Sequence, residues 1–249
     1  MENEIEIKKE LLDKISKIYN PSSEKTDFDF WYSYFDLETV KKFIVGEKII
    51  ELGCGKGIIT LELAKIAKKV IVIEGSKNNI NYVKNIAKER NVNNIEFVYS
   101  LWEKFQYNSS DISDILLISG PQYLEPERFL ELLRKAKLWL KQNGRFHIIA
   151  PNAYSMHRRI ARYMNIIKDV HDLSDRDKKL GHKKVYDREE LFDICTKAGY
   201  KIFHWEGIFL KPFQNDILKN LNKAIIRALY EIGKELPDYC AHIYICLTK

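Results

Sequence analysis

Three glycines at alternate positions constrain the fold of this chain more than any other feature. Gly53, Gly55 and Gly57 follow a short apolar run at 48–52 and precede a segment of helical periodicity at 58–65. Glycine tolerates positive φ and lets the backbone approach a ligand closely, because it has no Cβ. The sequence therefore predicts a strand, a tight loop and a helix in direct succession.

The loop differs from two common nucleotide-binding loops. A dinucleotide fingerprint requires glycine or alanine where this chain has Ile58. The Walker pattern G-x-x-x-x-G-K-[S/T] does not occur in this loop. These differences argue against NAD and against a P-loop nucleotide.

A carboxylate follows the next predicted strand. Glu74 comes directly after the strand at 70–73, at the separation of about 20 residues at which an acid follows a dinucleotide loop. A carboxylate at that edge of the sheet can accept hydrogen bonds from both hydroxyls of a ribose. We therefore expect Glu74 to lie close to whatever the glycine loop binds.

Strands and helices alternate along the middle of the chain, and this order predicts an α/β fold with a parallel, doubly wound sheet. A turn signal, Asn143-Gly144, is expected to end the last of these helices. After the glycine loop and its helix, the expected elements are strand 70–73, helix 77–88, strand 95–99, strand 114–118, helix 126–140 and strand 145–150.

The last third of the chain departs from this alternation. A helix at 188–198 precedes two β-rich runs, 201–210 and 241–247, which predict an antiparallel pair at the edge of the sheet. Between them, one apolar face indicates an amphipathic helix, expected to serve as a lid or a dimer surface. That face consists of Leu218, Leu221, Ile225, Leu229 and Ile232.

Length and composition favour one cytoplasmic domain with insertions. The 249 residues, 45% of them hydrophobic, can bury a full core, and the net charge of +6 is too small to imply nucleic acid by itself. The scattered cysteines predict neither a disulfide framework nor a metal site, and no apolar stretch is long enough to cross a bilayer. Within the domain 1–249 we expect an N-terminal helical lid at 1–45, a basic insertion at 153–186 and a helical insertion at 212–236.

The segment 49–57, Ile-Ile-Glu-Leu-Gly-Cys-Gly-Lys-Gly, resembles the first motif of class I S-adenosylmethionine (SAM)-dependent methyltransferases, and the segment 70–75 resembles the second. The resemblance extends over most of the chain. It implies a mostly parallel, seven-stranded Rossmann-like sheet with an antiparallel C-terminal edge strand and a helical lid. It also implies SAM as the cofactor and S-adenosylhomocysteine as the product.

The resemblance assigns roles to individual positions. Glu51 would organise the loop and approach the methionine amino group, the three glycines would pass beneath the methionine, and Glu74 would bind the ribose. Leu101 and Trp102 occupy the adenine position, where Ser100 replaces an acid that is often found in the family. An aromatic segment at 28–35 could supply a ring to the sulfonium. The expected cofactor contacts are Tyr32, Glu51, Gly53, Cys54, Gly55, Gly57, Glu74, Gly75, Ser76, Leu101, Trp102 and Ser119.

The acceptor is expected beyond the fourth strand, at residues 119–123. Ser-Gly-Pro-Gln-Tyr stands there in place of the Asn/Asp-Pro-Pro-aromatic signature of nucleic-acid amino-methylases, which makes base methylation less favoured. The predicted acceptor contacts are Gln122, Tyr123, Asn152, Tyr154, Arg158 and Tyr186.

The insertion at 153–186 is too long for an ordinary connection and should cap the active site. Its nine basic and four acidic residues give it an excess of five positive charges. Such a lid favours an anionic acceptor, although a solvated helical face would look the same. His157 and His182 are candidate catalytic bases for an acceptor that must lose a proton.

Together these features predict SAM-dependent methylation of a small, anionic acceptor, with O-methylation preferred. Two segments of the insertion, 152–158 and 181–186, also resemble bacterial small-molecule methyltransferases of surface-polysaccharide clusters, including capsular phosphoramidate enzymes. N-methylation of an amine, methylation of RNA or protein, and SAM binding without turnover stay open. No nucleic acid, membrane or metal partner is expected, and a homodimer is possible.

Overall fold

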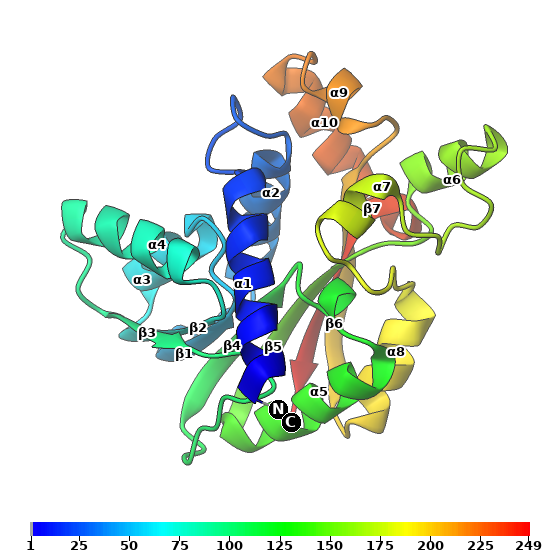
Figure 1. The fold of residues 1–249 in the computed structure, drawn as a ribbon. Helices are drawn as coiled ribbons and strands as arrows, with labels where there is room; N and C mark the ends of the chain where they lie inside the picture. Colours follow the sequence, from blue (N-terminus) through cyan, green and yellow to red (C-terminus); the bar gives the residue numbers. More distant parts are fainter. Residues whose placement is uncertain (1) are drawn as a thin grey trace.

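The computed structural model, which describes residues 2–249, is built around one mixed sheet of seven strands (Figure 1). Their order is β3-β2-β1-β4-β5-β7-β6, and β7 runs antiparallel to both of its neighbours. The predicted doubly wound, mostly parallel sheet is thereby confirmed. The strands are β1 (Lys48–Leu52), β2 (Lys69–Glu74), β3 (Ile95–Tyr99), β4 (Ile112–Ile118), β5 (Leu140–Pro151), β6 (Lys201–Leu210) and β7 (Cys240–Thr248).

The C-terminal strand lies one place inside the sheet, not at the edge where we expected it. β7 is buried along nearly its whole length, which suits a strand covered on both faces. The first residues of β6 are exposed or half-buried, as is typical of an edge strand. β6 is therefore the edge strand. Because β7 is antiparallel to both β5 and β6, the end of β6 reaches the same edge of the sheet as the end of β5.

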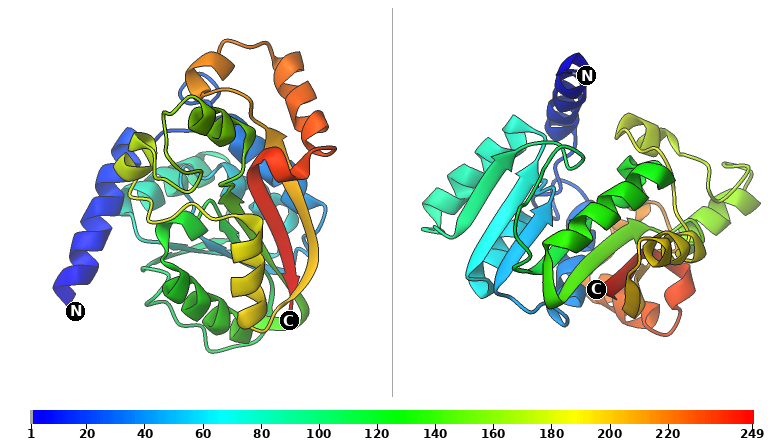
Figure 2. Two further views of the ribbon diagram at one scale, coloured as in Figure 1. Left: turned by 90° about the vertical axis from the view of Figure 1, so that its right-hand side faces the viewer. Right: turned by 90° about the horizontal axis from the view of Figure 1, so that it is seen from below.

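Helices cover both faces of the sheet (Figures 1 and 2). Neighbouring residues of β1 point to opposite faces: Ile50 packs in the cluster with α5 and α8, and Ile49 in the cluster with α2, α3 and α10. None of the described helices combines the length and apolar character that a membrane crossing requires. The helices are α1 (Glu2–Ile18), α2 (Asp29–Lys41), α3 (Ile58–Ile66), α4 (Lys77–Glu89), α5 (Pro126–Trp139), α6 (Met156–Tyr163), α7 (Asp175–Lys179), α8 (Arg188–Lys197), α9 (Asn215–Leu218) and α10 (Lys223–Gly233).

Two expected elements have different boundaries in the structure. Helix α5 ends at Trp139, and Asn143-Gly144 lies inside β5 as a bulge, where the pairing with β4 jumps from Leu140 to Arg145. The amphipathic face expected around 218–232 is divided between α9 and α10. The division occurs because the Asn222 side chain accepts the Ile225 N–H at 2.9 Å and so starts a new helix.

The N-terminal helix is attached to the turn that follows β2 rather than to the sheet. The Asp13 carboxylate accepts hydrogen bonds from Ser76 Oγ and from the Asn78 N–H at the start of α4. One turn further along α1, the Ser16 carbonyl accepts a hydrogen bond from Lys56 Nζ at 2.6 Å. The two views in Figure 2 show the first turns of α1 projecting from the body of the protein. These contacts bring the C-terminal half of α1 close to the glycine loop.

A buried carboxylate fixes the segment that enters β1. Asp114 is fully buried and accepts the N–H groups of Val45 and Gly46, each at 2.9 Å. It also bonds His147 Nε2 at 3.1 Å. We expect Asp114→Ala to lower the free energy of unfolding by about 3–5 kcal/mol, because the donors around Asp114 lose their acceptor inside the core. Urea denaturation measures this loss.

The control is Asp111→Ala, which removes a carboxylate three residues earlier, just before β4. Asp111 is largely solvent-exposed and pairs with Lys48 at 2.5 Å, so its loss should cost less than about 1 kcal/mol. Equal effects of the two substitutions would contradict the assigned role of Asp114.

Candidate functional site

A cavity of about 920 Å³ opens at the carboxyl ends of the parallel strands, where open α/β sheets bind ligands. Sites for one small molecule measure about 300–1,000 Å³, so this cavity has room for more than one ligand. Its walls come from loops that follow the strands, from α1 and α2, and from both insertions. Sixteen of the predicted site residues line it: Tyr32, Glu51, Gly53, Cys54, Gly55, Glu74, Gly75, Leu101, Trp102, Ser119, Gln122, Tyr123, Asn152, His157, Arg158 and His182.

The three loop glycines have different roles. Gly53, Gly55 and Gly57 all have positive φ, at 90°, 48° and 77°. A Cβ on Gly55 would enter open space, whereas a Cβ on Gly53 would come within 3.0 Å of the Trp102 ring. Gly57 lies outside the cavity lining, and a Cβ there would come within 2.8 Å of Val83. Gly57 thus allows α3 and α4 to pack closely.

Glu74 joins the glycine loop to the end of β2. Its Oε2 accepts the Cys54 N–H at 3.1 Å, and its Oε1 accepts the Ser76 N–H at 2.8 Å. The side chain is buried, and burial raises its pKa although these hydrogen bonds oppose the rise. Oε2 also accepts the Cys54 thiol at 3.5 Å, but Oε1 has a second lone pair, so Glu74 can still accept a hydrogen bond from a ligand.

Glu51 brings an unsatisfied carboxylate to the same loop. Its Oε2 is buried without a hydrogen-bond partner. Burial, followed by the nearby charge of Glu74, raises the pKa of Glu51 to about 8. A buried acceptor of this kind suits a cationic donor from a ligand, because the cation would restore the charged form of the carboxyl group.

The side of the cavity near Leu101 and Trp102 is lined by apolar groups. The Trp102 ring packs against the backbone at Gly53, and its Nε1 donates to the Ile73 carbonyl at 3.3 Å. A Cβ on Gly75 would meet Leu101 and the Leu12 side chain of α1. The absence of a side chain at Gly75 therefore lets α1 approach this end of the cavity.

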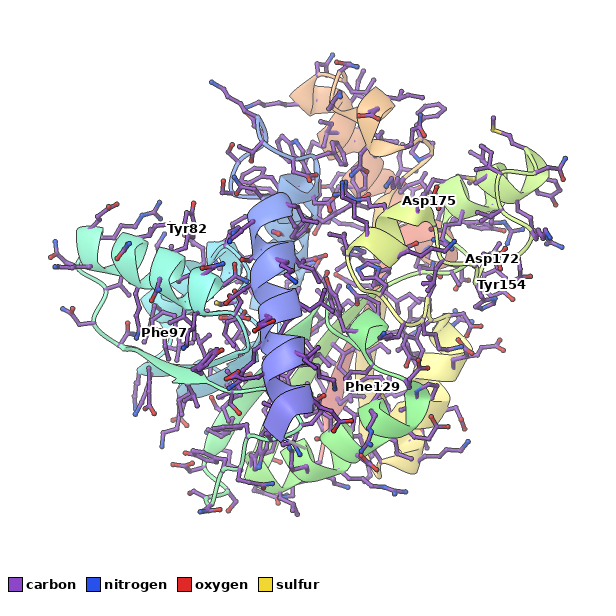
Figure 3. All side chains as sticks on the ribbon, in the orientation of Figure 1. Tyr82, Phe97, Phe129, Tyr154, Asp172 and Asp175 are labelled. Atoms are coloured by element: carbon purple, nitrogen blue, oxygen red, sulfur yellow. The ribbon has the colours of Figure 1, made fainter. Side chains whose placement is uncertain are left out.

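Three other predicted contacts lie outside the cavity lining. Ser76 caps α4, since its Oγ accepts the Asn79 N–H at 3.2 Å. Tyr154 lies on the outer side of the insertion, where Figure 3 shows it near Asp172. The centres of the Tyr154 and His171 rings are 5.6 Å apart. Tyr186 is a core residue, and its hydroxyl donates to the Leu124 carbonyl at 2.8 Å. Capping and core packing thus account for Ser76 and Tyr186.

The turn after β4 supplies another unsatisfied acceptor. Ser119 adopts a left-handed φ of 49° and accepts the Gln122 side-chain N–H at 2.8 Å through its carbonyl. Gln122 Oε1 remains buried and unpaired. Asn152 differs, because its amide donates to the carbonyls of Asp238 and Cys240 and its oxygen accepts the Tyr154 N–H. Asn152 therefore serves mainly to fix the backbone.

The two predicted histidines have unlike surroundings. His182 Nδ1 lies 2.8 Å from an Asp177 oxygen, and its ring meets Tyr123 edge-on at 4.9 Å. His157 Nδ1 is buried without a partner, and burial together with nearby Lys211 lowers its pKa well below the usual value. Arg158 lines the cavity, but it donates to the Val170 and Asp172 carbonyls and pairs with Asp177 at 3.4 Å.

The sequence analysis missed three residues of the cavity. His242 Nδ1 lies 2.9 Å from Asp36 Oδ1, and both side chains are almost fully buried. Lys211 follows the end of β6 and is 8% exposed. Asp36 and His242 are separated by 206 positions, so only the fold brings them together. Since β7 is antiparallel, its first residues share an edge with the ends of the parallel strands. His242 could have been predicted from this placement.

A family model described as a methyltransferase domain matches residues 45–215. The chain belongs to this methyltransferase family. It is a SAM-dependent methyltransferase, and the predicted enzyme class and cofactor are confirmed.

Relatives differ in how much of the chain they match. The ubiquinone biosynthesis O-methyltransferase of Rickettsia felis is 25% identical over 206 residues, which cover 79% of this chain and 77% of the relative. The ribosomal RNA small subunit methyltransferase G of Glaesserella parasuis is 28% identical over 104 residues, or 41% of this chain. The chain spans about half the length of that relative (51%).

A solved structure supports the fold. The SAM-dependent methyltransferase from Mesorhizobium loti superposes with a TM-score of 0.62 at 18% identity, covering 86% of this chain and 95% of its own. At this identity the likeness concerns the architecture alone. The predicted Rossmann-like methyltransferase fold agrees with it.

The residues of this methyltransferase fit SAM. The unpaired Glu51 oxygen suits the amino group of the methionine, and the open space above Gly55 leaves room for its chain. Glu74 retains acceptor capacity for ribose hydroxyls, and Leu101 and Trp102 offer apolar surface for the adenine. These contacts remain proposals for the individual residues.

The loop glycines give the first test of this cradle. We expect Gly55→Ala to weaken S-adenosylhomocysteine binding about tenfold or more, because its methyl group projects into the open space, while positive φ costs about 1–2 kcal/mol of stability. Isothermal titration and thermal unfolding measure the two effects. Gly57→Ala is the matched control: it should mainly lower stability, and adding Val83→Ala should restore part of it. Unchanged binding by Gly55→Ala would count against the cradle.

The raised pKa of Glu51 predicts a pH dependence of binding. Below pH 8 the carboxyl group of the free protein is mostly neutral, whereas a bound ammonium group favours the carboxylate, so binding releases a proton. S-adenosylhomocysteine affinity should therefore rise with pH, by at most about tenfold per unit, and level off above about pH 8. Titrations in buffers of several pH values test this, and Glu51→Gln should remove the slope. A slope that persists in Glu51→Gln would assign it to another group.

Proposed function

We propose that this enzyme transfers a methyl group from SAM to a hydroxyl oxygen of a small acceptor, with His242 as the general base. The observation that carries the proposal is the pairing of His242 with Asp36 in the wall of the cavity. Because a carboxylate can only accept, the bond to Asp36 places the proton of neutral His242 on Nδ1. The other ring nitrogen, Nε2, then has a free lone pair that can receive a hydroxyl proton.

Asp36 supports His242 more directly than Asp177 supports His182. Both oxygens of Asp36 lie near His242 Nδ1, at 2.9 and 3.2 Å. Asp177 instead accepts hydrogen bonds from the backbone and hydroxyl of Ser174, pairs with Arg158, and contacts His182 as well. Its charge is thus divided among several donors, and we assign His182 to the wall of the cavity beside Tyr123.

His157 is a poor base in this environment. It lines the cavity, but no carboxylate partner for its ring is found among the described residues. Burial and the positive charge of Lys211 disfavour its protonated form, as the lowered pKa shows. A neutral imidazole can still donate or accept a hydrogen bond, so we assign His157 to acceptor binding.

SAM, when bound, supplies an electrophilic methyl group. The protein has to position the acceptor oxygen in line with that group, exclude water and take up the hydroxyl proton. The helix α1, the insertion at 153–186 and the segment 211–217 border the cavity and can shield it from solvent. His242 provides the proton acceptor, and Asp36 stabilises the imidazolium that results.

Size and similarity favour a small acceptor. The cavity holds about 920 Å³ and is bordered by helices, whereas RNA or protein would need an open surface. The relative from Rickettsia felis, which is named an O-methyltransferase, matches most of the chain, while the ribosomal RNA enzyme from Glaesserella parasuis matches 41% of it. A setting in surface-polysaccharide or capsular biosynthesis stays a prediction from the sequence.

The basic insertion gives less support to an anionic acceptor than its composition suggested. Several of its cations pair with acids of neighbouring elements: Arg176 with Asp27 and Asp29, and Lys184 with Glu190. Arg158 is likewise occupied within the insertion. An anionic acceptor remains part of the proposal, but the charge that binds it must be sought elsewhere.

Substitution of the base tests the proposal. With an acceptor found by screening small hydroxyl compounds against labelled SAM, His242→Asn should lower kcat by about 10²- to 10⁴-fold. Asp36→Asn should also lower kcat, because it removes the charge that stabilises the imidazolium. S-adenosylhomocysteine affinity should stay unchanged in both variants.

The matched control is His204→Asn, which disrupts a histidine–carboxylate pair outside the cavity lining. His204 Nε2 lies 3.2 Å from Glu206 Oε2 on the edge strand, and its loss should leave kcat unchanged. If His242→Asn retained full activity, the general-base assignment would be wrong. Methylation of amines but not of hydroxyl compounds would favour an N-methyltransferase instead.

A further inference from the structure

Lys211 is a buried cation of the cavity for which no carboxylate partner is found among the described residues. Its side chain lines the cavity, and its ammonium lies 5.3 Å from the centre of the Tyr32 ring. Among the described residues, the hydrogen bond found for its Nζ goes to a neutral acceptor, Asn215 Oδ1, at 2.7 Å. A lysine this deeply buried normally pairs with a carboxylate.

Asp29 is the acid whose charge acts most strongly on Lys211, and it already has two partners. Asp29 accepts a hydrogen bond from the Asn215 amide at 2.7 Å and pairs with Arg176 at 2.9 Å. The charged groups that face Lys211 are Asp29 from α2, Arg158 from α6, and Arg176 and Asp177 from α7. Asp29 and Asp177 are paired with Arg176 and Arg158, and no direct ion pair is found for Lys211 Nζ among the described residues.

Two polar atoms beside Lys211 also lack partners. The Tyr32 hydroxyl and His157 Nδ1 are buried without hydrogen bonds, and both residues line the cavity. The Tyr32 hydroxyl can donate, and Nδ1 can donate in the tautomer that protonates it. Leaving such buried groups unsatisfied is unfavourable, and a ligand with acceptor oxygens would satisfy them.

The backbone before Lys211 is strained in a way that suits a functional position. Phe209 has a φ of 64°, in the left-handed region that bulky residues rarely adopt. Its ring is held between those of Tyr32 and Phe35, at centroid distances of 5.8 and 5.5 Å. Packing of Phe209 therefore maintains the turn from which Lys211 enters the cavity.

We propose that Lys211, Tyr32 and His157 form a subsite for an anionic oxygen group of the acceptor, either a carboxylate or a phosphate. The inference rests on the proposed function in that the acceptor occupies this cavity. It places the anion-binding charge on a residue just after β6, outside the basic insertion. His242, whose ring lies 4.7 Å from that of Tyr32, adjoins the subsite, so that an anion bound there would hold the rest of the acceptor near the base.

Equilibrium binding tests the subsite without turnover. The probes are benzoate and phenyl phosphate, each compared with neutral benzamide, titrated into the full-length protein saturated with S-adenosylhomocysteine. We expect one of the two anions to bind about tenfold or more tightly than benzamide. Preference for benzoate would identify a carboxylate subsite, and preference for phenyl phosphate a phosphate subsite.

Lys211→Met should abolish the preference for the anion, since it replaces the charge with an apolar side chain of similar length. Lys179→Met is the matched control, because Lys179 belongs to the basic insertion but is exposed and outside the cavity lining. It should keep the preference. If Lys211→Met does not fold, the wild-type protein still gives an answer through pH.

Burial lowers the pKa of Lys211 to about 8. Its ammonium form is present below that pH and is lost above it, so the affinity for the anion should fall between about pH 8 and pH 9.5. The affinity for benzamide should not follow this fall. Anions that bind no better than benzamide, or equally well to Lys211→Met, would overturn the subsite. Neither result would alter the outcome for His242, because binding is measured without methyl transfer.

Discussion

The carboxylate of Glu74 holds together the part of the molecule on which the site depends. It accepts one N–H from the glycine loop after β1 and one from the turn after β2. Parallel strands end at the same edge of a sheet, so each loop there presents backbone donors that need acceptors. One buried side chain satisfies donors from two neighbouring loops. The position of the cavity follows from this arrangement.

The cavity retains polar groups that the fold leaves without partners. Among the described residues, six buried side-chain atoms lack a hydrogen bond, and four of them belong to residues that line the cavity: Tyr32, Glu51, Gln122 and His157. Buried polar groups are nearly always satisfied in native proteins, because desolvation without a partner is costly. Their concentration in one place is therefore best explained by ligands. Glu51 lies at the cofactor loop, and Tyr32 and His157 lie on the side of Lys211.

Local patterns in the sequence were sufficient to predict that the glycine loop and Glu74 lie together at the cavity. The glycine spacing and the acid at 74 depend on strand, loop and helix succession, and these elements form within about 30 residues of chain. The acceptor half depends on contacts between distant segments. His242 and Asp36 meet because β7 is inserted between β5 and β6, and periodicity contains no information about that pairing.

Composition could not show which cations are free to bind an acceptor, for a related reason. The excess of positive charge in the insertion is real, but composition does not show which cations are neutralised by neighbours. Arg176 is paired with acids of the segment before α2 and of α2 itself, about 150 residues earlier in the chain. The sequence alone did not identify Lys211, because it is a single lysine between a strand and a proline. Its importance appears only when burial and the occupation of Asp29 are known.

The N-terminal helix links the cofactor loop to the closure of the cavity. Lys56 belongs to the glycine loop, and its ammonium donates both to the Ser16 carbonyl of α1 and to Asn79 at the start of α4. Asp13 of α1 is bonded to the same first turn of α4. Hydrogen bonds made by Lys56 and Asp13 thus join the loop, α1 and α4 directly to one another. A change in the backbone of the loop would shift α1 as well, and with it the apolar cover that Leu12 provides at Gly75.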